Sequence, residues 1–230
     1  MVPSANAGSR DQKRDFCILK PAGYKVKERQ NIMKHIICYG DSNTWGNTGN
    51  GSRYDDELQW PNILQSKLGQ DYKVIQEGLR ARIAGNYETE KPYLNGQSSF
   101  EAIYRSAMPV NVLIIALGTN DFKSKYARSA QDIYNDLLWY AQKAEQLNTE
   151  NNGAKVEIII LAPANYVSKK DYFEGDQSIR EELLELFIDC EYPHIMVSDL
   201  QLSEDGIHYS EQDHQKIATI MTQQIKEQSS

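Results

Sequence analysis

Long apolar stretches are missing from this sequence of 230 residues. Its longest apolar runs, VLIIAL and IIILA, are far shorter than the roughly 20 residues that a membrane-spanning helix needs. Cysteine is also scarce, with three residues and no CxxC or CxxH pair. This spacing argues against the common zinc and redox motifs, and an odd count is typical of a reducing compartment. We therefore expect a cytoplasmic protein with no membrane partner.

Positive charge is in short supply as well. The chain has 25 Lys and Arg against 32 Asp and Glu, a formal net charge of −7, so we expect no nucleic-acid partner. The first 32 residues differ, because they carry seven Lys/Arg and three Asp/Glu, which leaves −11 (−7 minus +4) on the remainder. They show neither helical nor strand periodicity and no apolar signal-peptide core. We expect a disordered extension over residues 1–32 and one domain over residues 33–230.

Two common catalytic loops are absent. The glycine-rich stretch GNTGNGSR, Gly46–Arg53, lacks the GK[ST] sequence of a phosphate-binding loop. The stretch GDSNT has Thr44 where the GxSxG elbow of α/β-hydrolases has its second glycine. A phosphate-binding loop and a standard nucleophile elbow are thus both excluded.

From Met33 onward, short apolar runs alternate with amphipathic stretches. The runs are continuously apolar, as expected of strands that are covered on both faces. Five strands separated by crossover segments predict a parallel, doubly wound α/β sheet. The predicted strands are His35–Tyr39, Tyr72–Gln76, Val110–Leu117, Val156–Ala162 and Ile195–Asp199, and the predicted helices, with apolar residues at 3.6-residue spacing, are Ala130–Leu147, Gln177–Asp189 and Ser210–Glu227.

Polar segments follow four of these strands. Ser42 follows the first, Gly78 the second, GTND (Gly118–Asp121) the third and EDGIH (Glu204–His208) the fifth. Ligands of open α/β sheets bind beyond the carboxyl ends of the strands. We therefore expect these segments, distant in sequence, to meet at one edge of the sheet.

The residue types at this edge suit acyl transfer. That chemistry needs a nucleophile, an oriented base and donors for the oxyanion. Ser42 is the candidate nucleophile, His208 the candidate base and Asp205, three residues earlier, the carboxylate that orients it. Backbone N–H groups of Ser42 and Gly78 and the side-chain amide of Asn120 are candidate donors. Each segment taken alone is also explained as an ordinary turn.

The other histidines are simpler to explain as structural or solvated. His35 begins the first strand, His194 follows a proline and His214 falls in the last helix. His208 and His214, with Asp205 and Asp213, have a spacing that matches no usual helical zinc motif. We expect no metal site. Asp121 is interpreted as bonding within its own loop.

Taken together, YGDSNTWG, a glycine after the second strand (VIQEGLRAR), LGTNDFK and DGIH resemble the four blocks of the SGNH (GDSL-type) hydrolase family, most closely its bacterial arylesterase and carbohydrate-esterase branch. The resemblance implies a three-layer α/β/α sandwich with a flavodoxin-like sheet and no metal or organic cofactor. It implies that Ser42, His208 and Asp205 form the catalytic triad. It also implies an oxyanion hole made by Ser42, Gly78 and Asn120.

The second block departs from the usual EGLxGRT of that branch, since Ala81 and Ile83 replace its second glycine and its threonine. This departure bears on the substrate preference rather than on the chemistry. The resemblance implies a serine esterase acting on acetyl or short-chain esters of sugars or aryl alcohols, a small-molecule substrate. An acyltransferase with the same triad, a non-catalytic binding module and a homo-oligomer remain open. Asp41, Trp45, Arg82 and Tyr166 are the candidate substrate-binding residues.

Overall fold

The computed structural model describes residue 1 and residues 33–89, 91–151, 153, 155–167 and 173–228. The expected N-terminal extension therefore lies outside the described residues, apart from Met1. Within residues 33–228 the fold centres on one five-stranded parallel sheet with strand order β2-β1-β3-β4-β5. The strands are β1 (Lys34–Gly40), β2 (Tyr72–Gly78), β3 (Val112–Ala116), β4 (Glu157–Leu161) and β5 (His194–Ile195).

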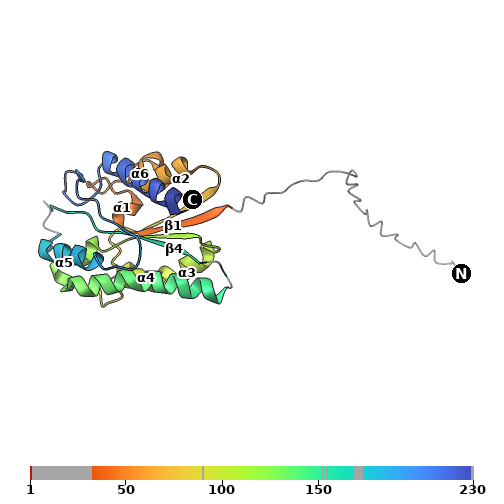
Figure 1. The fold of residues 1–230 in the computed structure, drawn as a ribbon, viewed down its shortest axis with the longest axis horizontal. Coiled ribbons are helices and arrows are strands. Elements are labelled where there is room, and N and C mark those ends of the chain that lie inside the picture. Colours follow the sequence, from red (N-terminus) through yellow and green to blue (C-terminus); the bar gives the residue numbers. More distant parts are fainter. Residues whose placement is uncertain (2–32, 90, 152, 154, 168–172, 229–230) are drawn as a thin grey trace. The chain divides into compact units, whose positions relative to one another are not determined.

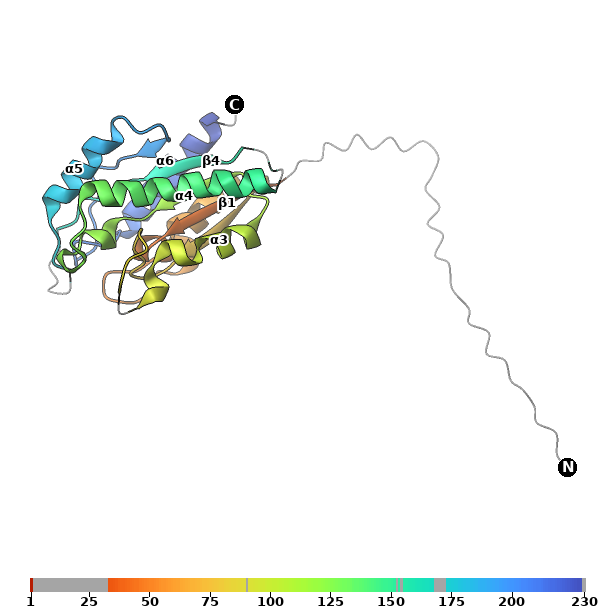
Figure 2. The same cartoon turned by 90° about the horizontal axis from the view of Figure 1, so that it is seen from below.

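Helices cover both faces of this sheet (Figure 1). One face carries α2 (Trp60–Leu68) and α6 (Glu211–Gln228), and the other carries α3 (Gly96–Ala107), α4 (Ala130–Glu150) and α5 (Gln177–Phe187). Figure 2 shows α4 lying along the sheet beside α3. The predicted three-layer α/β/α sandwich is thus confirmed. The short elements are α1 (Ser42–Trp45) and the 3-10 turns η1 (Asp56–Leu58), η2 (Pro92–Leu94), η3 (Thr119–Phe122) and η4 (Ser124–Tyr126).

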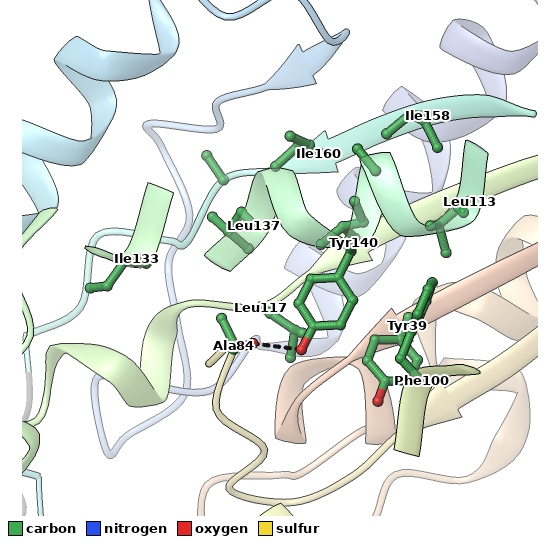
Figure 3. Packing of buried hydrophobic residues seen from close by; sticks show 14 of the residues in the cluster. Tyr39, Ala84, Phe100, Leu113, Leu117, Ile133, Leu137, Tyr140, Ile158 and Ile160 are labelled. Carbon is green, nitrogen blue, oxygen red and sulfur yellow. Dashed lines mark hydrogen bonds between the residues drawn. The ribbon is translucent and has the colours of Figure 1, made fainter. Parts of the chain in front are cut away.

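An aromatic cluster fills the layer between the sheet and α3 and α4. Tyr39 of β1, Phe100 of α3 and Tyr140 of α4 are fully buried and pack ring against ring (Figure 3). The Tyr140 hydroxyl donates to the carbonyl of Ala84 at 2.6 Å, because a buried hydroxyl needs a partner. This bond ties the loop after β2 to the longest helix. It therefore fixes a segment that borders the site described below.

Two elements differ from the sequence-based prediction. The fifth strand is the pair His194–Ile195 rather than Ile195–Asp199, and it lies at the edge of the sheet beside β4 alone. Beyond it the chain leaves the ladder, and Val197 packs instead in the core beneath α2 and α6. The helices α2 and α3 were not among the predicted helices. Within the described residues, no helix is long and apolar enough to cross a membrane.

Candidate active site

Ser42 is the first residue of α1, immediately beyond the end of β1. Asp41 caps this short helix, since its carboxylate accepts the backbone N–H of Asn43 at 2.9 Å. A Cβ at Gly40 would lie 1.9 Å from the Thr44 hydroxyl. Only glycine therefore lets the chain turn so tightly from strand into helix, and this turn presents Ser42 at the carboxyl edge of the sheet.

The loop that follows β5 brings a histidine against this serine. His208 Nε2 lies 2.9 Å from Ser42 Oγ, and His208 Nδ1 lies 2.5 Å from Asp205 Oδ2. Ser42 and His208 are 7% and 6% exposed and Asp205 is 1% exposed, so the chain of three polar groups is shielded from bulk water. The structure thus joins three residues that the sequence singled out from two distant segments.

A side chain that the sequence reasoning left without a role locks the two segments together. The Asn43 amide oxygen accepts the backbone N–H of Tyr209 at 2.9 Å, and its Nδ2 lies 3.5 Å from the Ile207 carbonyl. Asn43 is buried beside Ser42 on α1. It therefore holds the residues on either side of His208 at a fixed distance from the serine. Its place in the quoted GDSN block was the available signal.

The Asp205 carboxylate is held by the loop that contains His208. Its Oδ1 accepts the backbone N–H groups of Ile207 and His208 at 3.0 and 3.1 Å. Burial alone would raise its pKa, but the hydrogen bonds from the His208 side chain and from these two amides outweigh burial, so the pKa of Asp205 is lowered. The carboxylate is therefore ionised and accepts a proton-bearing Nδ1, which leaves the Nε2 lone pair facing Ser42.

A cavity of about 180 Å³ opens beside Ser42 and His208. Its position at the carboxyl ends of β1, β2 and β3 agrees with the rule for open α/β sheets. Asn120 lines it, as expected from the sequence, but Gly78 does not. The full lining is Ser42, Asn47, Arg80, Ala81, Thr119, Asn120, Lys123, Phe173, Ile207 and His208.

Gly78 serves packing rather than the cavity. It ends β2 opposite Gly40, and a Cβ at this position would lie 2.3 Å from the backbone nitrogen of Trp45. The missing side chain thus makes room for the backbone of α1. Three residues further on, Ala81 lines the cavity with a positive φ of 62°. Ala81 occupies the position of the second glycine in the EGLxGRT pattern, which was the signal that sequence reasoning passed over.

The Asn120 side chain is fixed at both ends of its amide. Its Nδ2 donates to the carbonyl of Arg82 at 3.0 Å, and its Oδ1 accepts from Lys123 Nζ at 2.8 Å. An amide nitrogen carries two hydrogens. Among the described residues, no hydrogen bond engages the second one. This N–H is available to a ligand in the cavity that Asn120 lines.

The prediction that Asp121 bonds within its own loop holds for its backbone N–H, which donates to the Gly118 carbonyl at 3.1 Å, but not for its side chain. Both of its carboxylate oxygens accept the backbone N–H of Ala84, and Oδ1 also accepts the Tyr87 hydroxyl. Burial and, to a smaller extent, the nearby Asp136 raise the pKa of Asp121 to about 7, against the lowering effect of these hydrogen bonds. Asp121 therefore anchors the loop after β2 to η3.

None of the four candidate substrate-binding residues lines the cavity. Asp41 is buried as the cap of α1. The Trp45 ring lies beneath the guanidinium groups of Arg53 and Arg80. Arg82 is buried, donates to the carbonyls of Gly40 and Glu77 and stacks on Tyr39. Tyr166 is buried between Phe122 and Phe173.

His214 has a structural role. Its Nδ1 accepts the backbone N–H of Trp60 at 3.2 Å, and burial lowers its pKa to about 4 despite the opposing charge of Asp213. The His214 ring is fully buried and bonded to α2, so it is not placed to bind a metal ion together with His208. Within the described part of the chain, no group of three or more His, Cys, Asp or Glu residues is placed to hold a metal ion.

Comparison with known structures places this fold among ester hydrolases. The M. smegmatis aryl esterase aligns with a TM-score of 0.74 and 26% identity, covering 84% of this chain and 99% of that one. A carbohydrate acetylesterase from Sinorhizobium meliloti (TM-score 0.73, 24% identity, 84% and 98% coverage) shares the fold. A lipase/acylhydrolase from Enterococcus faecalis does so more distantly (TM-score 0.58, 19% identity, 85% and 97% coverage). No curated protein sequence gives a match.

The family model for GDSL-like lipases and acylhydrolases matches residues 36–221, well over half of the chain. This range begins in β1, ends in α6 and contains the whole site. The resemblance inferred from the four sequence blocks is thereby confirmed. The chain belongs to the GDSL-like lipase/acylhydrolase family and is a carboxylic ester hydrolase.

Proposed function

We propose that this enzyme hydrolyses acetyl and other short-chain esters of aryl alcohols or sugars through an acyl-enzyme on Ser42. The observation that carries the proposal is the unbroken chain of short contacts from Ser42 Oγ through His208 to Asp205. A serine hydroxyl is a weak nucleophile unless a base accepts its proton. His208 Nε2 is placed to accept it, and Asp205 holds the tautomer that makes this possible.

The reaction proceeds in two halves. Ser42 Oγ attacks the ester carbonyl as its proton passes to His208, and the same proton then goes to the leaving alcohol, so that the acyl group stays on Ser42. A water molecule next gives its proton to His208 and attacks the acyl carbon. The proton returns to Ser42 as the acid leaves. The imidazolium formed in each half is stabilised by the ionised Asp205.

We propose that three N–H groups stabilise the oxyanion formed in each half. They are the backbone N–H groups of Ser42 and Ala81 and the free amide hydrogen of Asn120. Ala81 replaces Gly78 in this set because Ala81 lines the cavity and Gly78 packs against α1. Donors held in place before the reaction stabilise the developing charge without reorganisation.

The proposed acyl length follows from the size of the cavity. At about 180 Å³ it is smaller than the ~300–1,000 Å³ typical of pockets for drug-sized ligands. Phe173 and Ile207 line it, and both are buried. An acetyl group fits such a space, while a long acyl chain has to extend beyond it. The similarity to the M. smegmatis aryl esterase supports an aryl leaving group.

Steady-state kinetics with p-nitrophenyl acetate, butyrate and octanoate test this function. We expect kcat/KM to be highest for acetate and at least about tenfold lower for octanoate, since each excluded methylene loses its burial. Ser42→Ala and His208→Ala should each lower kcat by at least about 10³-fold. A preference for octanoate would contradict the acyl length. Near-normal turnover by either variant would contradict the mechanism.

The choice of leaving group needs a separate panel. Acetylated monosaccharides and naphthyl acetate, compared at equal concentration, separate a sugar ester from an aryl ester. Analysis of the products with added alcohol measures the share of acyl groups that pass to an acceptor other than water. Transfer that exceeds hydrolysis in dilute alcohol would replace the hydrolase proposal with an acyltransferase.

A further inference from the structure

Lys123 brings a positive charge into the cavity beside the proposed oxyanion site. It lies at the end of η3, is half-buried, and has its Nζ 2.8 Å from Asn120 Oδ1 and 5.3 Å from the centre of the Phe173 ring. In the described part of the chain, no carboxylate forms an ion pair with it. The mechanism above gives this cation no role.

We infer that Lys123 is a positioning residue, which holds the Asn120 amide with its free N–H toward the oxyanion and strengthens that donor by its charge. The inference rests on the proposed function. Lys123 makes no bond to the reacting atoms in this account. It acts only through Asn120.

The orientation of the amide is decisive because its two ends have opposite polarity. An amide turned by 180° about its last side-chain bond would present a carbonyl oxygen to the oxyanion, which repels it. The Lys123 ammonium is a donor only and the Arg82 carbonyl is an acceptor only. Since these two groups contact opposite ends of the Asn120 amide, the turned amide would lose both hydrogen bonds.

The charge of Lys123 also acts on the strength of the donor. A cation bonded to the amide oxygen draws electron density from the amide nitrogen, so its N–H becomes a better donor. This effect is larger in the transition state, where the oxyanion has formed, than in the ground state. It should therefore appear in kcat.

The charge of Lys123 is pH-sensitive within the range of an enzyme assay. Burial and the nearby Lys125 of η4 lower its pKa from 10.5 to about 8, against the opposing charges of Asp41 before α1 and Asp121 of η3. Arg80 and His208 also line the cavity. Because Lys123 is a cation below its pKa and neutral above it, the support for Asn120 is present up to about pH 8 and is lost above.

A double-mutant cycle between Asn120 and Lys123 tests the inference. Asn120→Ala should lower kcat by about 10²–10³-fold. Lys123→Met should lower kcat by about tenfold or more, but by no more than Asn120→Ala does, since Lys123 acts through that amide. In the Asn120→Ala background, Lys123→Met should cost less than about twofold, because its partner is gone. KM should stay within about twofold in Lys123→Met, and Lys123→Arg should restore part of kcat.

The pH profile gives a second readout that a merely structural residue would not move. The wild-type kcat/KM for p-nitrophenyl acetate, corrected for spontaneous hydrolysis, should fall above about pH 8. Lys123→Arg should move this fall to higher pH, since a guanidinium stays charged. Lys125→Met is the matched control, since Lys125 is the exposed neighbouring lysine. This variant should keep kcat at pH 7. It should move the fall in kcat/KM to higher pH, because the charge that lowers the pKa of Lys123 is removed.

Three results would overturn the inference. These are an unchanged kcat in Lys123→Met, an equal loss in the wild-type and Asn120→Ala backgrounds, and a rise in KM alone, which would make Lys123 a direct substrate contact. Thermal unfolding of each variant separates these results from loss of the fold. Failure of the proposed function is distinct, since Ser42→Ala would then remain active whatever Lys123→Met does.

Discussion

At the scale of single residues, Asp205 has its two oxygens assigned to different tasks. Oδ1 accepts two backbone N–H groups of its own loop, and Oδ2 faces His208 Nδ1. The first task shapes the loop and the second selects the tautomer of the ring. Because its pKa is lowered, the ionised carboxylate contributes stability that is fully present above the usual range for aspartate and is lost as the pH falls from that range through the lowered pKa.

Asp205→Asn should separate these tasks. The amide oxygen can still accept the two backbone N–H groups, while the amide nitrogen donates to His208 Nδ1 and so places the ring proton on Nε2, facing Ser42. We expect kcat to fall by about 10³–10⁴-fold. The melting temperature should fall only slightly, because the charge is lost while the two backbone hydrogen bonds remain. Glu204→Gln, at the exposed carboxylate one position earlier, is the control and should keep full activity. An active Asp205→Asn enzyme would refute the assigned tautomer.

The sequence carried enough information to find Ser42, His208, Asp205 and Asn120, because each stands in a polar segment directly after a strand. The sequence did not show which of Gly78 and Ala81 lines the cavity. A glycine indicates that something approaches its backbone closely, but not whether that is a ligand or another part of the chain. Here the approaching group is the backbone of Trp45. Lys123 was passed over because a single lysine gives no sign of burial.

At the scale of elements, the junction of β2 with α1 determines where the serine stands. The first turn of α1 contains Ser42, and its last residue, Trp45, lies against Gly78 at the end of β2. Any atom added at Gly78 therefore pushes on the short helix that presents the serine. Packing this close leaves no space to absorb a methyl group.

Gly78→Ala should lower the free energy of unfolding by about 1–3 kcal/mol and lower kcat through displacement of α1. Urea unfolding followed by circular dichroism measures the first effect. Ala81→Gly is the comparison for stability, because its φ of 62° suits glycine. It should keep or raise the free energy of unfolding. An unchanged stability in Gly78→Ala would show that the space at β2 is not filled as described.

A helix that buries many apolar residues was predicted well, and a helix that buries few was not. The helix α4 follows its 3.6-residue pattern through Ile133, Leu137 and Tyr140, all fully buried. The helix α3 was missed because it begins with Gly96 and buries mainly Phe100 and Tyr104. At β5, an apolar run continues past the sheet into the core, and the sequence alone does not reveal where the ladder ends.

At the scale of the whole molecule, strand order creates the site. The strand β1 lies between β2 and β3, so the segments after three neighbouring strands converge, and the loop after β5 closes over them. The contact between Ser42 and His208 spans 166 positions of sequence. The doubly wound sheet and the convergence at its edge were predictable from the alternation of strands and helices. The size of the cavity was not, because it depends on side chains from five separate segments.

The central claim is that folding activates Ser42. The most direct test is to treat the protein with a fluorophosphonate and to map the adduct by mass spectrometry. The folded enzyme should be labelled at Ser42 alone, His208→Ala should be labelled at least about 10²-fold more slowly, and Ser42→Ala and heat-denatured enzyme should not be labelled. Folded protein that stays unlabelled, or that carries the adduct on another residue, would contradict the account.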